Sequence, residues 1–360
     1  MRIIQVIDTL DIGGAEKMCI QLANLLNEKG HDVVILYFQY TEINLVEQVH
    51  KDIPIHLITI KENWFNPLYF YKILRLIQQF DIVHVHMRSS LRIIYLATFF
   101  GKLIKKVVFH DHTGGSEQFE ESSRGCFIPQ AMRAFNYVAV YNELAQKSVS
   151  KFNLDSKSAK VISNFVTKPQ YNNIEIFPFD NSNLEILFVG NFRKQKNVIF
   201  LISLCEELQL YPKTKFRFHI IGAINDKKYF EQFIELIYSK SLKAHFIIHN
   251  GLSNVFNFTG KVNLALMPSI EESGPLVLIE YLILNLPFLA HNVGDITDKI
   301  ATFLPNQVMD NLNPSIWAKK IQSYDFQKDI MEYERIFSSE FNEEVAYKKW
   351  IEVYKGIQSK

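Results

Sequence analysis

Residues 268–287 read PSIEESGPLVLIEYLILNLP, a stretch that combines a strand end, a tight turn and a short helix. Pro275 suits the first helical position, because its fixed φ matches a helix and its missing N–H is not needed there. The apolar run that follows should end before Pro287, since the residue preceding a proline is pushed out of the α region. Apolar residues cover this helix on nearly every side, which predicts that it is buried.

Glu280 is the only charged residue of the expected helix, and a carboxylate is rarely buried without a partner. Two partners would satisfy it: an Arg or Lys in the core, or a vicinal diol such as a ribose. The preceding turn favours the diol, because Gly274 lets the backbone approach closely and the N–H groups of Leu276 and Val277 form a phosphate site at the helix N-terminus. These features describe a nucleotide pocket, with Glu272 on the far side of the phosphate.

The composition is that of a globular protein of a reducing compartment. A length of 360 residues suggests two domains, and a hydrophobic share of 48% can build real cores. The net charge of +1 gives no support for nucleic-acid binding. Three scattered cysteines form neither a disulfide framework nor a zinc spacing. Asp8 comes too early for a signal peptide, and the longest apolar stretch, 93–100, is too short to span a membrane. We therefore expect a cytoplasmic protein.

Two successive series of strands and helices predict two parallel α/β domains. A stretch rich in Pro and Asn over residues 169–183 separates the two series, and we interpret it as a linker. The first domain is then expected over residues 1–168 and the second over residues 184–340. Residues 343–357 form an amphipathic pattern that predicts a last helix.

Four histidines lie near the ends of two expected strands of the first domain. His84 and His86 share one strand face, and His110 and His112 share a face of the next strand. The HxH spacing is known among zinc ligands, but the sequence has no Cys or Glu cluster that completes such a site. We favour hydrogen-bonded histidines that line the carboxyl edge of a parallel sheet, where open α/β folds bind ligands. Metal binding remains the alternative.

Residues 113–126, which read TGGSEQFEESSRGC, are polar and contain glycine. Such a composition is typical of a loop, and functional loops often carry binding contacts. We therefore predict a loop here that acts as a lid or contacts an acceptor.

Two further turns follow expected strands. Residues 190–197 read GNFRKQKN, and Arg193 and Lys196 before a helix favour a phosphate site, with a solvated basic loop as the alternative. Gly13 and Gly14 stand in the turn after the first strand but do not form G-x-G-x-x-G, which argues against a nicotinamide cofactor. They predict either a tight turn or a close approach of the backbone to a ligand.

The chain resembles glycosyltransferase family 4, whose retaining enzymes have the GT-B fold of two Rossmann-like domains facing each other across a cleft. The resemblance rests on P-S-x-x-E-S-G-P-L-V-L-I-E at residues 268–280, on G-G-A-E-K at residues 13–17 and on D-I-V-H-V-H at residues 81–86. The first motif matches the E-x7-E signature of that family. The resemblance implies that Glu272 approaches the donor sugar and that Glu280 binds the nucleotide ribose. It also implies that the last helix packs back on the first domain.

The same resemblance implies roles for residues of the other motifs. His112 corresponds to the cleft histidine near the reactive carbon of the sugar, with His110, two residues earlier, as the second choice. Lys196 matches the Lys of a G-R-x-x-x-x-K motif. The Arg position of that motif holds Asn191, which is a departure, and we interpret Arg193 as a replacement two residues on. The expected catalytic residues are His112, Glu272, Arg193 and Lys196, and the expected donor-binding residues are Gly13, Gly14, Asn191, Gly274, Pro275, Leu276, Val277 and Glu280.

By this resemblance we expect a retaining glycosyltransferase of surface polysaccharide biosynthesis (capsule, exopolysaccharide or lipopolysaccharide). The donor would be a UDP- or GDP-linked sugar and the acceptor a glycan or a lipid-linked glycan. The sequence contains no D-x-D motif, so we expect neither a metal nor a cofactor, with the leaving diphosphate stabilised by basic residues and a helix N-terminus. The alternatives are a non-catalytic nucleotide-sugar-binding subunit, which the Asn191 departure would favour, and a sugar-nucleotide epimerase.

A lipid-linked acceptor would require transient contact with the inner face of the membrane. Lys102, Lys105 and Lys106 stand beside Phe99 and Phe100, and this group is the contact that we expect. A solvated helix end is the alternative explanation for the same residues.

Overall fold

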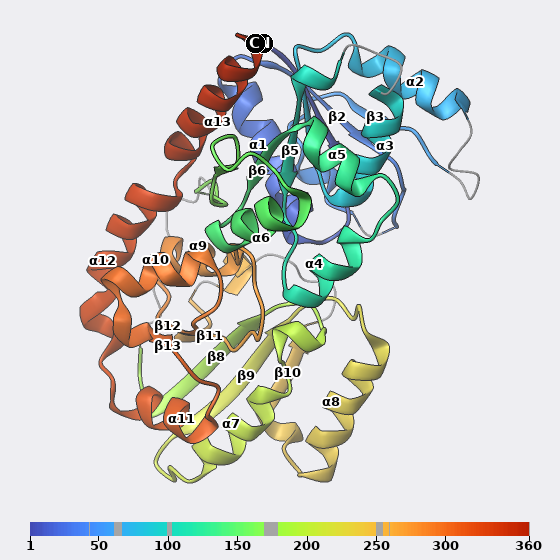
Figure 1. Cartoon of the computed structure of the whole chain (residues 1–360). Helices are drawn as coiled ribbons and strands as arrows, with labels where there is room; N and C mark the ends of the chain where they lie inside the picture. The colour runs from blue at the N-terminus through green and yellow to red at the C-terminus, as the bar shows by residue number, and fades with distance from the viewer. Residues whose placement is uncertain are drawn as a thin grey trace. The chain divides into compact units, whose positions relative to one another are not determined.

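The structure is a computed structural model that describes residues 1–42, 44–60, 67–98, 103–168, 179–249, 255–258 and 260–359. The chain divides into two compact units. Unit 1 comprises Met1–Thr167 and Asn342–Lys360, and unit 2 comprises Lys168–Phe341. Each unit contains its own sheet, as Figure 1 shows. Most of the expected linker lies outside the described residues.

Unit 1 is built on a parallel sheet with the strand order β3-β2-β1-β4-β5-β6-β7. Its strands are β1 (Arg2–Ile7), β2 (Asp32–Tyr37), β3 (Ile55–Leu57), β4 (Ile82–His86), β5 (Val107–Asp111), β6 (Asn136–Ala139) and β7 (Lys160–Val161). Its helices are α1 (Gly14–Glu28), α2 (Pro67–Ile77), α3 (Arg88–Thr98), α4 (Ser116–Ser123), α5 (Ile128–Ala134), α6 (Asn142–Phe152) and α13 (Glu343–Gln358). The strand order reverses between β1 and β4, and sheets of this type bind ligands at the carboxyl ends of the strands beside such a reversal.

Alternation along the central strands decides which side chains face each layer of helices. Val85 of β4 belongs to an apolar cluster with residues of α2, α3, α5 and α6. Its neighbours His84 and His86 face the other side, where α13 packs against His84. The Trp350 ring lies 4.5 Å and the Tyr354 ring 5.9 Å from the His84 ring, centroid to centroid. The C-terminal helix is therefore part of the core of unit 1.

Residues 113–126 do not form the loop that their polar composition predicts, because α4 occupies most of the segment. Arg88, at the start of α3, holds this helix from one side. Its guanidinium donates hydrogen bonds to Ser122 Oγ at 3.0 Å and to Ser123 Oγ at 2.8 Å. The partner that holds the helix is more than thirty residues away in sequence, so local composition did not reveal it.

The surface of α2 combines apolar and basic side chains. Leu68 and Tyr71 are 65% and 59% exposed, and the exposed Lys72 and Arg75 continue the same stripe at helical spacing. Lys106 is not part of a free basic surface, since its Nζ donates to the carbonyl oxygen of Phe80 at 2.5 Å. Burial lowers the pKa of this lysine.

Within the ranges that the structure describes, no helix joins sufficient length to sufficient apolar character to cross a membrane. Lys102, Phe99 and Phe100, which belong to the expected membrane contact, lie outside the described residues.

Unit 2 is built on a second parallel sheet with the strand order β10-β9-β8-β11-β12-β13. Its strands are β8 (Asn183–Val189), β9 (Lys215–Ile221), β10 (Phe246–His249), β11 (Leu264–Met267), β12 (Phe288–His291) and β13 (Val308–Met309). Its helices are α7 (Phe200–Gln209), α8 (Lys227–Ser239), α9 (Leu276–Ile283), α10 (Asp295–Phe303), α11 (Pro314–Ser323) and α12 (Ile330–Ile336). The order has the same form as that of unit 1, with the reversal between β8 and β11.

Two glycines allow the backbone that follows β8 to pass close to the backbone that follows β9. A Cβ on Gly222, which follows β9, would lie 2.0 Å from the carbonyl oxygen of Gly190, which follows β8. No side chain fits at this distance, so Gly222 sets the start of the turn that follows β8.

Candidate active site

The residues that the sequence analysis singles out follow the carboxyl ends of strands at or near the two reversals: β1, β8 and β11 border a reversal, and β5 is one strand further on. In unit 2 they follow β8 and β11, and in unit 1 they follow β1 and β5. Each unit therefore carries its own group of candidate residues.

Lys196 and Glu272 form the central contact of the unit 2 group. Lys196 lies in the short helix η3 (Lys194–Lys196) after β8, and its Nζ is 2.5 Å from Oε1 of Glu272, which follows β11. Ser269 Oγ donates to the same carboxylate oxygen at 2.7 Å. The carboxylate is largely buried while the lysine keeps more contact with solvent. The structure thus joins two residues that the sequence analysis places in catalysis.

Backbone contacts hold the two loops of this group together. The Ile270 N–H donates to the Gln195 carbonyl at 2.8 Å, and Asn197 Nδ2 donates to the Pro268 carbonyl at 3.1 Å. His291 Nδ1, at the end of β12, bonds the Ser269 carbonyl at 2.8 Å. The sequence analysis missed the role of His291, although a polar residue at the end of an expected strand is a usable signal.

Gly294 lets the turn after β12 pack closely against the backbone of Glu272 and Ser273. It has a φ of +82°, and a Cβ there would lie 3.0 Å from the carbonyl oxygens of both Glu272 and Ser273. A side chain at this position would be strained by the φ and would meet backbone that cannot give way. The glycine therefore helps to fix the position of the Glu272 backbone.

Glu280 lies inside α9, as the sequence predicts, and is only 5% exposed. Pro275 is not the first helical residue but the residue before the helix, because its ψ of 102° is extended. Leu276 and Val277 are consequently the first two residues of α9, and Gly274 lies just before Pro275. Their N–H groups belong to the first turn, where helix amides have no partner within the helix.

Asn191 stands at the altered position of the basic motif, and Arg193 stands two residues further on. The two side chains have different surroundings. Asn191 Oδ1 accepts the Ala223 N–H at 3.0 Å, so this amide ties the chain after β8 to the chain after β9. The side chain of Arg193 is exposed and has no hydrogen bond or ion pair within the described part of the chain, while its carbonyl oxygen accepts the Lys196 N–H at 3.0 Å. Among the side chains of this motif, that of Lys196 is the one that contacts Glu272 in the described structure.

The unit 1 group begins at the turn after β1. Gly13 has an extended backbone before α1, and Gly14 opens that helix with no atom within 4 Å of the place a Cβ would take. Asp8, at the end of β1, accepts a hydrogen bond from the Ser90 hydroxyl. Burial raises the pKa of Asp8 to about 6 and also raises the pKa of Glu16. The sequence analysis did not identify these two carboxyl groups.

Contacts on both sides fix the backbone around His112. Asp111 forms a buried ion pair with Arg88 at 2.8 Å. The other oxygen of the same carboxylate accepts from the Thr113 hydroxyl at 2.6 Å and from the Thr113 N–H at 3.1 Å. His112 is thus held between two anchored neighbours and stays half-buried at the end of β5.

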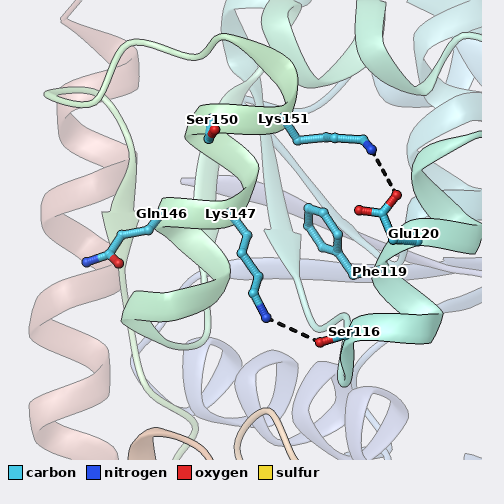
Figure 2. A pocket seen from close by; sticks show the side chains of 7 residues that line it. All are labelled: Ser116, Phe119, Glu120, Gln146, Lys147, Ser150 and Lys151. Carbon is cyan, nitrogen blue, oxygen red and sulfur yellow. Dashed lines mark hydrogen bonds and ion pairs between the residues drawn. The ribbon is translucent and has the colours of Figure 1, made fainter.

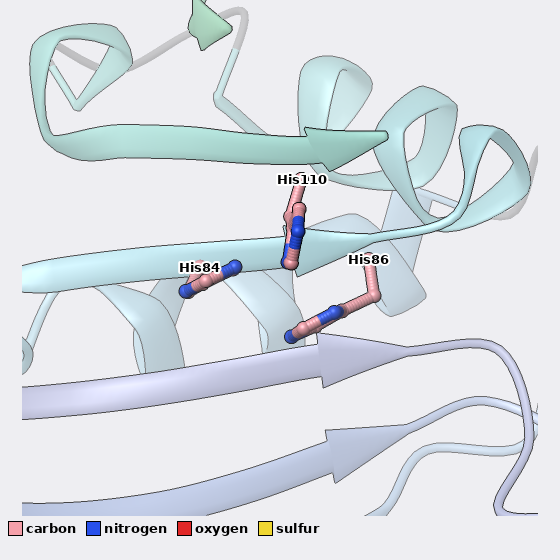
Figure 3. A group of neighbouring side chains, drawn as sticks. All are labelled: His84, His86 and His110. Carbon is pink, nitrogen blue, oxygen red and sulfur yellow. The ribbon is translucent and has the colours of Figure 1, made fainter. Parts of the chain in front are cut away.

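A cluster of imidazoles lies beneath His112. His84 and His86 extend from β4 and His110 from the neighbouring β5, as Figure 3 shows. His86 Nδ1 lies 2.9 Å from His112 Nε2, and His84 Nδ1 lies 2.7 Å from the Tyr354 hydroxyl.

Burial lowers the pKa of all four histidines, and it lowers that of His112 to about 4. The nearby imidazoles add to the effect on His84, His86 and His110. All four rings are therefore neutral near pH 7.

The three buried histidines, His84, His86 and His110, are also close enough to one another to be considered as a metal site. One nitrogen of each ring lies within 4.8 Å of the other two. However, the rings of His84 and His86 are stacked, with centroids 4.4 Å apart and an interplanar angle of 3°. Lone pairs in the planes of parallel rings do not converge well on one ion, and both nitrogens of His86 already have hydrogen-bond partners. These orientations favour a packed, hydrogen-bonded cluster over coordination.

A hollow of about 530 Å³ lies between α4 and α6 of unit 1, and Figure 2 shows its lining. It is lined by Ser116, Phe119, Glu120, Gln146, Lys147, Ser150 and Lys151. Both lysines already have carboxylate partners: Lys147 pairs with Glu143 at 2.7 Å and Lys151 with Glu120 at 2.8 Å. The hollow therefore does not by itself indicate an anionic ligand.

Known proteins share this architecture along the whole chain. The structure of Anabaena HepE in complex with UDP and glucose superimposes with a TM-score of 0.80 at 17% identity, covering 99% of this chain and 100% of that one. Staphylococcus aureus TarM, solved with UDP, Fondaparinux and alpha-GlcNAc-glycerol, gives a TM-score of 0.76 at 12% identity, with 98% and 99% covered. The fold is therefore that of the GT-B glycosyltransferases, with two Rossmann-like domains.

Sequence comparison leads to the family. A sequence model of glycosyl transferases group 1 matches residues 170–324, and a model of Glycosyltransferase Family 4 matches residues 12–168. The capsular polysaccharide biosynthesis glycosyltransferase CapH of Staphylococcus aureus is 23% identical over 331 residues, which cover 89% of this chain and 90% of that protein. The chain belongs to glycosyltransferase family 4 and is a glycosyltransferase, so the expectation drawn from the motifs is confirmed.

Because their folded-state pKa values are lowered, the buried imidazoles should make the fold less stable in mild acid. Their folded-state pKa lies below the value near 6.5 of the unfolded chain, so protons bind the unfolded chain more readily. The stabilisation is complete above about pH 6.5 and is lost as the pH falls toward about 4, where His112 is protonated in the folded state. Asp8, Glu16 and Glu343, whose pKa values burial raises, act in the opposite direction, but these three carboxyl groups oppose four imidazoles.

Below about pH 6.5, we expect the free energy of unfolding to fall by about 1.4 kcal/mol per pH unit for each histidine whose pKa burial lowers. Urea denaturation between pH 7 and pH 5 measures this slope. His110→Phe should reduce the slope, whereas a change at the exposed His56, His56→Gln, should leave it as it is. A stability that does not depend on pH over this range would contradict the prediction.

Proposed function

We propose that this enzyme transfers a sugar from a nucleotide-linked donor to a glycan or lipid-linked acceptor, with retention of anomeric configuration, in surface polysaccharide biosynthesis. The UDP in the HepE and TarM structures supports a UDP-linked donor over a GDP-linked one. The name of CapH supports a role in capsular or related polysaccharide synthesis.

The contact between Lys196 and Glu272 carries this proposal. A sugar transfer leaves a nucleoside diphosphate whose negative charge must be stabilised as the bond breaks. Lys196 supplies a cation, and the first N–H groups of α9 supply donors of the kind that bind phosphate at helix N-termini. Glu272 and Ser269 hold this lysine and its loop in place before the donor arrives. In this proposal Glu272 lies toward the sugar and Glu280 binds the ribose.

The proposal also interprets the other candidate residues. Asn191 acts locally by capping the Ala223 N–H, so its departure from the family motif does not argue against transfer. Arg193 is exposed and is free to approach the outer side of a bound diphosphate. His112 is the residue of unit 1 that approaches the sugar.

Loss of the Glu280 charge should weaken nucleotide binding without unfolding the enzyme. Glu280→Gln keeps the shape of a side chain that is 5% exposed but removes a charge-assisted hydrogen bond to the ribose. We expect UDP to bind less tightly by about 1–3 kcal/mol, measured by titration calorimetry. Glu206→Gln, at an exposed pair on α7, serves as the matched control. Equal affinity in the wild type and Glu280→Gln would mean that Glu280 serves only the fold.

Turnover should not require a divalent metal ion. If Lys196 and the α9 N-terminus stabilise the leaving diphosphate, initial rates of donor consumption will be the same with and without excess chelator. Lys196→Ala should lower kcat by about 10²–10³-fold, the effect of removing one preorganised donor. Lys194→Ala changes an exposed lysine of the same short helix and should have little effect. Loss of activity in chelator that magnesium or manganese restores would refute the metal-independent reaction.

We further propose that unit 1 touches the anionic inner face of the membrane through α2. The exposed stripe of Leu68, Tyr71, Lys72 and Arg75 joins apolar and cationic groups, which is the composition of interfacial helices. Each cation near an anionic surface contributes only about 1 kcal/mol, so binding should be weak and should decrease with salt. Lys105 is exposed and remains available, whereas Lys106 is engaged with the chain after α2.

Sedimentation with vesicles of phosphatidylglycerol and phosphatidylcholine tests this contact. The wild type should pellet at low salt and be released at high salt, and a Leu68→Ser, Tyr71→Ser variant should stay in the supernatant. Leu210→Ser removes a side chain of unit 2 that is 72% exposed and should pellet like the wild type. If the wild type does not pellet at low salt, the acceptor is reached without this surface.

A further inference from the structure

A chain of hydrogen bonds runs across three neighbouring strands of unit 1 to His112. Gln5 lies on β1, His86 on β4, and His112 follows β5. The Gln5 Oε1 atom is 2.8 Å from His86 Nε2, and His86 Nδ1 is 2.9 Å from His112 Nε2. Gln5 and His86 are fully buried, whereas His112 is half-buried. The chain therefore leads from the sealed interior of the sheet to the strand edge.

The donors and acceptors of this hydrogen-bond chain can be assigned in order. An amide oxygen only accepts, so His86 Nε2 must carry a proton. A neutral imidazole has one N–H, which leaves His86 Nδ1 as an acceptor. His112 Nε2 must then be the donor in the next bond, and its Nδ1 keeps a lone pair. Because both rings are neutral near pH 7, one tautomer is selected at each.

We propose that Gln5 and His86 are positioning residues that fix the tautomer of His112, so that Nδ1 accepts a hydrogen bond from a hydroxyl group of the bound sugar. This inference rests on the proposed function, since it uses His112 as a residue that contacts the donor. A neutral acceptor suits that place for a physical reason. Positive charge develops on the sugar as the glycosidic bond breaks, and a protonated imidazole beside it would oppose that charge.

The orientation of the Gln5 amide decides the direction of the whole chain. If the amide were turned over, its NH₂ group would donate to His86 Nε2 and every proton would move to the opposite nitrogen. His112 would then carry its proton on Nδ1 and offer a donor to the sugar. The two orientations thus predict opposite tautomers of His112, which nitrogen NMR distinguishes.

The test is ¹⁵N NMR of histidine-labelled enzyme at pH 7.5 without donor. The protein has 11 histidines, and the signals of His86 and His112 are assigned by their loss in His86→Gln and His112→Gln. We expect protonated Nε2 and unprotonated Nδ1 at both residues. Protonated Nδ1 at His112 overturns the proposal, and so does a fast exchange of both tautomers.

A variant tests whether Gln5 is the origin of the selection. Gln5→Met keeps the length of the side chain but removes the acceptor, so His112 should show mixed tautomers. The kcat for sugar transfer should fall about fivefold, the factor that corresponds to one neutral hydrogen bond, with the donor KM unchanged. An unchanged tautomer in Gln5→Met would overturn the role of Gln5. If this variant does not fold, the spectrum of the wild type still decides the proposal.

Trp350→Phe is the matched control. It changes the ring that packs on His84, 4.5 Å between centroids, in the same buried cluster, and in the described structure Trp350 has no hydrogen bond to Gln5, His86 or His112, so the tautomer of His112 should be retained. The spectra require no substrate, which separates this inference from the proposed function. If the tautomer is as stated but His112→Gln transfers sugar at the full rate, the proposed role of His112 fails while the hydrogen-bond chain stands.

Discussion

The reversal of strand order in each sheet is the constraint on which the candidate site depends. Strands on the two sides of such a reversal are followed by chain that leaves toward opposite faces of the sheet, so their carboxyl ends are left open. In unit 2 the chains after β8 and β11 meet at this point through Lys196 and Glu272. In unit 1 the same position lies between β1 and β4, the strands of Gln5 and His86. Polar residues gather there because the helices do not cover that edge.

Close approach at these edges requires residues without side chains. Gly222 allows the turn after β8 to begin beside the end of β9, and Gly294 allows the turn after β12 to touch the backbone of Glu272. Both contacts are between backbones, which cannot move aside as a flexible side chain can. The ion pair between Lys196 and Glu272 is thus fixed by glycines that make no contact with either charge.

The two units solve the problem of buried polar groups in different ways. Unit 2 keeps a charged pair near solvent, where desolvation is limited and the lysine remains available to an anion. Unit 1 buries neutral imidazoles under Trp350 and also buries the ion pair of Arg88 and Asp111. Neutral rings cost less to bury than charged ones. The histidines of unit 1 are therefore placed for hydrogen bonding, whereas unit 2 holds the charged groups that the proposed function assigns to stabilising the leaving diphosphate.

Local sequence determined most of the strands and helices, the burial of Glu280 and the family, because apolar periodicity and the spacing of the E-x7-E motif are local properties. Tertiary structure decided what local patterns cannot encode. The polar segment 113–126 became α4 because Arg88 reaches it from another element. Asn191 serves the fold because Ala223 lies beside it. Gln5 contacts His86, and His86 contacts His112, only because β1, β4 and β5 are neighbours in the sheet. Such contacts depend on strand order, and no single stretch of sequence specifies that order.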